Sequence, residues 1–324
     1  MKIAKSNNKI MLISICIATY KRPKKLRLLL KELNKLVFEK IQRPEIDVIV
    51  VDNDVAGVAE RVCEEVKPQF QWNLKTGVEP QKGITYARNK TIEMVSADTD
   101  FIAIIDDDEV PEPSWLEELI VVQDKYDSDI VGGPVMPRFE EEEVPQWIIK
   151  GGFFDPARHP TGTRRPVVYT NNVLVKAEVL RSLDEVFDHR FAGIGGSDCY
   201  LFLKLHKLGY KITWADDAIV YDLIPSARTN LKWILLRHYR QLSSYSSSEK
   251  DLYPSFFIQL TRVMKGFALI AIGFARLIPS FLMGKAAIVN SLVYLCRGLG
   301  TLGGLLGLFY QEYKNREKLQ PAEK

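Results

Sequence analysis

Three consecutive aspartates, Asp106, Asp107 and Asp108, are the residues with the clearest chemical potential. They directly follow the apolar run Phe101–Ile105. Adjacent carboxylates repel one another, which costs stability unless a cation or hydrogen-bond donors compensate. Their hard oxygen atoms suit Mg²⁺ or Mn²⁺, which bind one or two carboxylates together with substrate phosphates. An acidic turn that merely ends a strand is the alternative, and the residue pattern alone leaves both open.

Other polar groups also follow apolar runs. Thr19 and Tyr20 come after Met11–Ala18, and Asp52-Asn53-Asp54 comes after Ile46–Val51. An acidic residue at the end of a strand can accept hydrogen bonds from a ribose or a base. No glycine-rich phosphate loop follows these runs, so a nucleotide here would be held by side chains and a metal ion.

Two further charged residues stand at expected helix starts. Arg88 follows Gly83, where it could pair with a diphosphate or with the strand-end aspartates, although a plain surface arginine is the default for such a segment. Asp198 follows the glycine-rich segment 193–196. It is either a helix-capping residue or a carboxylate at the mouth of a site, and the sequence does not decide between them.

Strands that alternate with helices must position these groups. Such alternation predicts an α/β fold with βαβ units and a mostly parallel sheet, whose ligands bind beyond the carboxyl ends of the strands. Residues 137–166 are expected to be a loop. The other expected elements are strands at Met11–Ala18, Ile46–Val51, Phe101–Ile105, Val167–Val175, Lys211–Trp214 and Ala218–Tyr221, and helices beginning at Pro23, at Gly83–Val95, after Pro113 and at Ser197–Leu208.

Composition excludes several classes of protein. The 324 residues have 46% hydrophobic and 26% charged content, which excludes disordered, collagenous and disulfide-scaffold chains. A net charge of +3 gives no support for nucleic acid as a partner. Four scattered cysteines predict free thiols in a reducing compartment. The short apolar run near the N-terminus is read as a buried strand rather than a signal peptide, so the body is expected in the cytoplasm.

The C-terminal region has a different character. From Pro254 to Gln311 it contains no Asp or Glu, and its charges are Arg262, Lys265, Arg276, Lys285 and Arg297. An apolar and purely basic segment predicts contact with an anionic membrane surface. Its uncharged stretches are each shorter than the ~20 residues of a membrane span, which favours helices lying in the interface, with a hairpin that dips into the bilayer as the alternative. We therefore expect a catalytic part at 1–225 and a helical, membrane-associated part at 226–324.

The order of motifs resembles that of family 2 glycosyltransferases with the Rossmann-like GT-A fold. The C-terminal region is similar to the membrane-associated end of bacterial enzymes that build exopolysaccharide or other lipid-linked glycans. The resemblance covers roughly residues 10–240. Its motifs are ICIATYKRP, VIVVDND, GITYARN, FIAIIDDDEVPEPSWL, YTNNVLV, GIGGSDCYLFLKLHKLGYKI and VYDLIPSAR.

The resemblance implies roles for individual residues. Asp198 would be the base that activates the acceptor. Asp108 would be the direct metal ligand, and Asp222, which stands where many relatives have histidine, a further one. Ser197 replaces a glutamate of the family pattern. The nucleotide pocket would be lined by Thr19, Tyr20, Asp52, Arg88, Asp106 and Asp107.

The implied activity is inverting transfer of one sugar, with Mg²⁺ or Mn²⁺, from a nucleotide-diphosphate sugar to a glycan acceptor. The donor would be a UDP-sugar, the acceptor lipid-linked, and the place the cytoplasmic face of a bacterial inner membrane. A processive polysaccharide synthase is disfavoured because there is no QxxRW element. A sugar-nucleotide nucleotidyltransferase would need a glycine-rich loop, and residues 17–25 contain no glycine. Ser197 and Asp222 keep a non-catalytic membrane scaffold as the remaining alternative.

Overall fold

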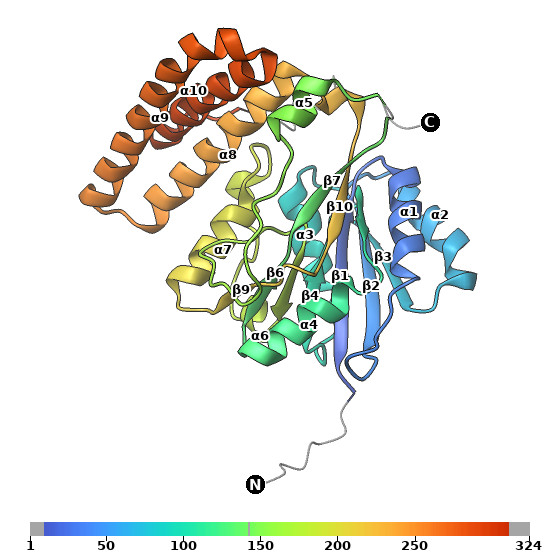
Figure 1. Ribbon diagram of the computed structural model, residues 1–324. Helices are drawn as coiled ribbons and strands as arrows, with labels where there is room; N and C mark the ends of the chain where they lie inside the picture. Colours follow the sequence, from blue (N-terminus) through green and yellow to red (C-terminus); the bar gives the residue numbers. More distant parts are fainter. Residues whose placement is uncertain (1–9, 142, 311–324) are drawn as a thin grey trace.

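The computed structural model describes residues 10–141 and 143–310 (Figure 1). It consists of an α/β body and a layer of three long helices on one side of that body. The helices of this layer are α8 (Leu231–Leu252), α9 (Phe256–Met283) and α10 (Lys285–Leu305).

A seven-stranded sheet forms the centre of the body, and it confirms the predicted GT-A-like α/β fold. The strand order is β3-β2-β1-β4-β8-β6-β9, and β8 runs antiparallel to both of its neighbours while all other pairs are parallel. The carboxyl ends of β1, β2 and β4 therefore meet at one edge. The strands are β1 (Leu12–Thr19), β2 (Glu45–Asp52), β3 (Asn73–Val78), β4 (Phe101–Ile104), β6 (Ile130–Gly132), β8 (Val173–Lys176) and β9 (Ile212–Trp214).

Helices cover both faces of this sheet. Along β1, Ile13, Ile15 and Ile17 pack on one side and Cys16 packs on the other. Burial on both faces explains why these strands have continuous apolar runs rather than alternating patterns. One face packs against α1 (Pro23–Leu33), α2 (Val58–Val66) and α4 (Trp115–Tyr126), and the other against α3 (Ile84–Glu93), α6 (Ala177–Arg181) and α7 (Ser197–Lys207).

A second, three-stranded sheet stands beside the carboxyl edge of the first. In it β10 (Val220–Ile224) lies between β5 (Glu109–Pro111) and β7 (Val135–Phe139). The pairing with β5 is antiparallel and sets Asp222 opposite Glu109. The backbone N–H of Leu223 donates to the carbonyl of Asp108 at 3.3 Å. This sheet therefore brings Asp222 to the aspartate run.

The prediction of a loop at 137–166 was wrong in part. The segment contains the end of β7 and a short helix, α5 (Gln146–Gly151). Both depend on partners far along the chain, because β7 pairs with β10 and Ile148 of α5 is buried in a cluster with α10 residues. The strand predicted from Val167 begins only at Val173. Three-residue 3₁₀ turns lie at Lys67–Gln69, His189–Phe191 and Ser226–Arg228.

In the helical layer, α10 lies between α8 and α9. A Cβ atom added at Gly300 would lie 2.3 Å from the carbonyl oxygen of Tyr239, and one at Gly304 would lie 2.2 Å from that of Ser243. Only glycine permits the backbones of α8 and α10 to approach so closely. Gly300 and Gly304 thus allow α10 to pack directly against the backbone of α8.

Candidate active site

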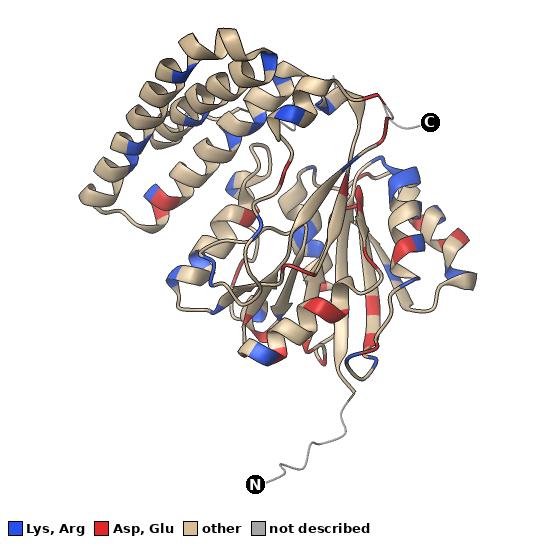
Figure 2. Cartoon of the chain, in the orientation of Figure 1, with Lys and Arg blue, Asp and Glu red and all other residues tan. Residues whose placement is uncertain are grey.

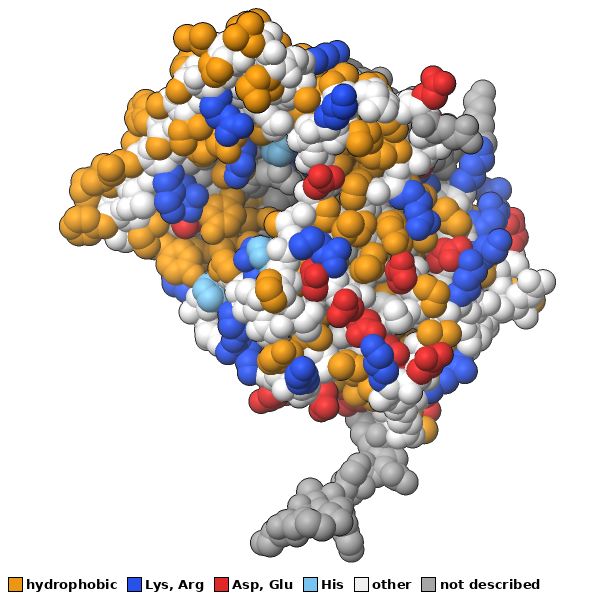
Figure 3. Space-filling view, in the orientation of Figure 1, with side chains coloured by type: hydrophobic (Ala, Val, Ile, Leu, Met, Phe, Trp, Pro, Cys, Tyr) orange, Lys and Arg blue, Asp and Glu red, His pale blue; other side chains and the backbone are white. Residues whose placement is uncertain are grey.

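A cavity of about 580 Å³ lies at the carboxyl edge of the large sheet, bounded on one side by α8. A recess between the helical layer and the body is visible in Figure 3. Thr19, Tyr20 and Asp52 are outside the described lining of the cavity. Six residues predicted from the sequence line it together: Arg88, Asp106, Asp107, Asp108, Asp198 and Asp222.

Arginines from other elements compensate the three adjacent aspartates. Arg88, on α3, donates from Nη2 to Asp106 Oδ1 at 2.8 Å. Arg22, just after β1, contacts Asp107 Oδ1 at 2.8 Å and Asp108 Oδ2 at 3.0 Å. These contacts offset the mutual repulsion of the carboxylates. Arg22 was missed as a candidate, although it belongs to the ICIATYKRP motif.

Thr19 holds Asp107, the middle aspartate of the run, by a hydrogen bond. Its hydroxyl, at the end of β1, donates to Asp107 Oδ2 at 2.7 Å. Asp107 is 5% exposed and all of its described partners come from the β1 end. In this structure Asp107 thus anchors the aspartate run to the strand beside it.

Arg228 joins the two predicted metal ligands. Its Nη2 lies 2.8 Å from Asp108 Oδ2 and its Nη1 lies 3.1 Å from Asp222 Oδ1. The two carboxylates therefore share a single cation, although they are far apart in sequence. Arg228 was not predicted, but it ends the VYDLIPSAR motif.

Glu109 is a further carboxyl group that the sequence analysis missed. It is 3% exposed, and its Oε2 accepts the N–H of Asp106 at 3.2 Å. Burial, together with Asp106, Asp222 and Asp108, raises its pKa well above the ordinary glutamate value. A glutamic acid that keeps its proton to higher pH reduces the negative charge of the cluster.

Asp198 is held at the start of α7 by an unusual backbone. Gly195 and Gly196 have φ angles of 77° and 91°, which favour glycine. A Cβ on Gly196 would lie 2.6 Å from that of Ser244, so α7 begins directly against α8. Burial raises the pKa of Asp198, and Arg88 opposes this. The carboxylate is thus a stronger base than an exposed aspartate.

Asp52 and Asn53 organise neighbouring backbone. The Asp52 carboxylate accepts the N–H groups of Ala59 at 2.9 Å and Asp54 at 3.0 Å, and so holds the start of α2. Asn53 accepts the N–H of Gly83 at 2.9 Å, at the start of the helix that carries Arg88. Contact of Asp52 with a nucleotide stays a prediction, as it does for Tyr20, whose ring lies beneath the Lys21 ammonium group.

Two carboxylates of the cavity, Asp108 and Asp222, are suited to hold a divalent ion together with a substrate. Among the residues that the structure describes, no group of three or more His, Cys, Asp or Glu side chains is arranged to hold one. Asp108 and Asp222, however, both contact the same positive charge, the guanidinium of Arg228. Two carboxylates together with substrate phosphates are a usual Mg²⁺ environment. The residues therefore fit such an ion when a diphosphate completes its coordination.

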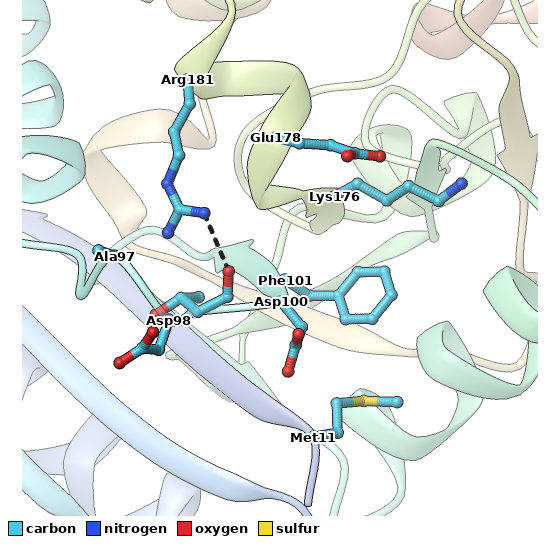
Figure 4. Close-up of a pocket in the computed structure, with 9 residues that line it drawn as sticks. Met11, Ala97, Asp98, Asp100, Phe101, Lys176, Glu178 and Arg181 are labelled. Carbon is cyan, nitrogen blue, oxygen red and sulfur yellow. Dashed lines mark hydrogen bonds between the residues drawn. The ribbon is translucent and has the colours of Figure 1, made fainter. Parts of the chain in front are cut away.

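A second cavity, of about 590 Å³, lies at the opposite edge of the sheet (Figure 4). Figure 4 shows Arg181 reaching the loop before β4, where it donates to the Thr99 carbonyl at 3.2 Å. Asp100 accepts the N–H of Leu12 at 2.9 Å, and Lys176 pairs with Asp129 at 3.1 Å. Its polar groups thus support the fold, at the edge where sheets of this kind do not bind ligands.

Comparison with solved structures supports the fold. S. aureus TarS 1-349 in complex with UDP matches with a TM-score of 0.52 and 17% identity, over 92% of each chain. The mannosyltransferase PcManGT from Pyrobaculum calidifontis, in complex with GDP-Man and Mn²⁺, matches with a TM-score of 0.60 and 15% identity, over 93% of this chain and 88% of that one. At these identities the likeness concerns the fold alone.

Sequence comparison gives the family. The chain is 26% identical over 316 residues to the succinoglycan biosynthesis protein ExoM of Rhizobium meliloti (strain 1021), which covers 96% of this chain and 98% of that protein. It is also 26% identical over 200 residues to the glucosyl-dolichyl phosphate glucuronosyltransferase of Haloferax volcanii, over 53% of this chain and 58% of that one. The model of the family "Glycosyl transferase family 2" matches residues 14–183. The chain therefore belongs to glycosyl transferase family 2 and is a glycosyltransferase of the bacterial exopolysaccharide type.

Proposed function

We propose that the protein is an inverting glycosyltransferase that moves one sugar from a nucleotide-diphosphate sugar to a lipid-linked glycan acceptor. It would act with Mg²⁺ or Mn²⁺ at the cytoplasmic face of a bacterial inner membrane, in polysaccharide or cell-surface glycan synthesis. The observation that carries the proposal is the single cavity lined by the Asp106–Asp108 run, Asp198 and Asp222. It combines groups for a diphosphate with a separate base.

The residues suggest a single displacement. Asp198 would accept the proton of an acceptor hydroxyl, whose oxygen forms the new bond to the anomeric carbon. The bond from that carbon to the donor phosphate oxygen breaks, and the nucleoside diphosphate leaves with the electron pair. Arg88 and Arg228 would offset part of the charge on the diphosphate. One attack from the opposite face inverts the anomeric centre.

Asp108 and Asp222 would hold the divalent ion, which when bound neutralises charge developing on the leaving diphosphate. UDP as the donor nucleotide is supported by a structural neighbour solved with UDP, whereas another was solved with GDP-Man and Mn²⁺. A lipid-linked acceptor is supported by the Haloferax relative, whose name refers to a dolichyl phosphate.

Helix α9 supports membrane contact. Seven of its large apolar side chains face outward at spacings of three, four or seven residues and form what we call the α9 stripe. The stripe is 40% or more exposed throughout, and orange side chains gather over this layer in Figure 3. Its members are Phe256, Leu260, Met264, Phe267, Phe274, Ile278 and Phe281. Lys265 and Arg276 are exposed beside it, so an anionic surface is a matching partner.

The packing favours α9 lying in the interface over a spanning hairpin. Both α9 and α10 are long and apolar enough to cross a membrane by length and composition. However, α10 is covered on one side by α8 and on the other by α9. Two of the five basic residues of this region are turned towards the protein, because Arg262 donates to Glu249 and Arg297 Nε is buried. In Figure 2, α9 and α10 carry blue Lys and Arg positions and no red Asp or Glu positions.

This arrangement also favours single transfer over processive synthesis, because within residues 10–141 and 143–310 one layer of long helices accompanies the body. We retain the division into a catalytic part at 1–225 and a helical part at 226–324, with the qualification that α8 forms a wall of the cavity.

The four cysteines are free in this structure, which is compatible with a reducing compartment.

Nucleotide release from a donor panel tests the proposed function. Purified protein in detergent would be incubated with UDP-glucose, UDP-GlcNAc, UDP-glucuronate and GDP-mannose, with Mn²⁺ or with EDTA, and with or without bacterial lipid extract. We expect one donor to be turned over with Mn²⁺, and more rapidly with the extract. Absence of binding and turnover with every donor would contradict the proposal.

The α9 stripe can be tested by substitution. Changing Phe267, Phe274 and Ile278 together to serine should lower co-sedimentation with anionic vesicles roughly tenfold or more, because each buried apolar side chain contributes about 1.5–3 kcal/mol. Affinity for UDP should be unchanged. Serine at Val55 and Leu208, which are also exposed apolar residues but lie on the body, is the matched control. Equal vesicle binding by the two variants would exclude the stripe as the membrane contact.

Asp222→Asn tests the second proposed ligand. We expect the Mn²⁺ concentration for half-maximal turnover to rise roughly 10–100-fold, as for groups that support a metal site, with most of the maximal rate retained. A titration of turnover against Mn²⁺ measures this. An unchanged Mn²⁺ requirement would mean that Asp222 serves only to hold Arg228.

A further inference from the structure

The inner face of α8 carries a cation in the wall of the cavity. Trp233, Arg237, Gln241 and Ser244 recur at helical spacing on α8, and all four line the cavity. Ser244 lies against Gly196, two residues before Asp198. The α8 wall therefore runs from Arg237 towards the base, about 10 Å along the helix at 1.5 Å per residue.

Arg237 has aromatic neighbours but no described ionic partner. Its guanidinium lies 5.2 Å from the Trp233 ring centroid and 5.5 Å from that of Phe154. Among residues 10–141 and 143–310, no side chain or backbone group makes a hydrogen bond or ion pair with it. Burial lowers its pKa, and Asp222 opposes this. A partly desolvated guanidinium without a partner is costly, and an anionic ligand would remove that cost.

Three other arginines that line the cavity differ from Arg237 because they are already paired with carboxylates. A fourth, Arg165, has a buried Nε without a hydrogen-bond partner among the described residues, but it does not lie on α8. Arg22 and Arg228 contact the strand-end carboxylates, and Arg88 contacts Asp106. His238, next to Arg237, adds no positive charge at neutral pH, since burial lowers its pKa to about 4. Arg237 thus forms an anion-binding position separate from the groups around the aspartates.

The aromatic neighbours of Arg237 belong to the apolar cluster that packs against the helical layer. Phe154 and Trp233 stack at 5.5 Å, and both belong to one apolar cluster. That cluster extends to Val289 and Val293 of α10, the helix that packs on α9. Val289 and Val293 are themselves buried, but Phe154 and Trp233 line the cavity, so a ligand held by Arg237 would have two aromatic rings beside its charged group.

We propose that Arg237 binds the phosphate of a lipid-linked acceptor, with Phe154 and Trp233 contacting the first part of its hydrocarbon chain. The acceptor's sugar would then extend along α8 towards Asp198. This inference rests on the proposed function only for the identity of the reaction, since the amphiphilic binding position follows from Arg237 and Trp233 of α8 and from Phe154. A phosphate of the donor is the competing source of the same chemistry.

Binding measurements with simple probes separate these sources. Farnesyl diphosphate represents a charged lipid, farnesol the same chain without charge, and UDP with Mn²⁺ the donor. For Arg237→Ala we expect affinity for farnesyl diphosphate to fall tenfold or more, because a charge-assisted hydrogen bond is lost. Affinities for farnesol and for UDP should stay within twofold of wild type. Arg237→Lys should restore part of the loss.

The control is Arg138→Ala, which removes a positive charge from the neighbouring strand β7, where Arg138 stacks on the Tyr221 ring at 4.0 Å. It should leave all three affinities unchanged. Weakened UDP binding with intact farnesyl diphosphate binding would overturn the proposal and assign Arg237 to the donor. Unchanged farnesyl diphosphate binding would also overturn it. Failure of the proposed function would instead appear as absent donor turnover by the wild-type protein.

Discussion

Replacing Asp108 by asparagine is expected to lower sugar transfer by roughly 10³-fold or more, because a carboxylate proposed to hold the divalent ion is lost. The fold should survive. Arg22 keeps Asp107 as a partner and Arg228 keeps Asp222, so no arginine is left with an unpaired charge. Turnover measured over a range of Mn²⁺ concentrations, together with a thermal unfolding curve, tests both statements.

Asp47→Asn is a suitable control for Asp108→Asn. Asp47 is a largely buried carboxylate on β2 that pairs with Lys75 at 2.6 Å, near the edge of the sheet opposite the cavity. Both variants remove one paired carboxylate, but only Asp108→Asn should affect turnover. Near-wild-type turnover of Asp108→Asn at limiting Mn²⁺ would refute the assignment of Asp108 as a ligand.

Replacing Asp198 by asparagine should lower turnover by roughly 10²–10⁴-fold, the usual contribution of a general base. Shape and the position at the start of α7 are kept, so affinity for the nucleotide should hardly change. An exposed carboxylate paired with Arg190, Asp251, provides the matched Asp→Asn control. Loss of nucleotide binding with intact residual turnover would place Asp198 on the donor side instead.

The pH dependence of the wild-type protein gives an independent test of Asp198. A base must be deprotonated, so kcat/KM should fall as the pH falls through its pKa. Burial raises that pKa, so the decline should begin at higher pH than for an exposed aspartate. The residual activity of Asp198→Asn should lack this decline. An unchanged acid limb in the variant would assign the titration to another group.

Much of the body could be predicted from the sequence because its determinants are local. Continuous apolar runs at β1, β2 and β4 indicate strands buried on both faces, and strands alternating with helices imply a mostly parallel sheet. In such a sheet the carboxyl ends of neighbouring strands meet, so Thr19 and the aspartate run could be expected at one edge. The motif order then identified the family without any knowledge of contacts.

The rest depended on contacts between distant segments, which hydrophobic periodicity does not encode. The antiparallel pairing of β5 with β10 brings Asp222 to Asp108, and only this pairing lets Arg228 bridge them. β7 and α5 likewise form only against β10 and α10, so their own residues look like a loop.

The helical layer shows the same dependence. From length and composition alone, both α9 and α10 are candidates for a membrane span. Tertiary packing distinguishes them, because Gly300 and Gly304 allow α10 to lie against the α8 backbone while the outer face of α9 stays exposed. The same packing turns Arg237 towards the cavity. A single sequence specifies which residues are apolar or charged, but which neighbour covers each of them is decided only when the helices pack.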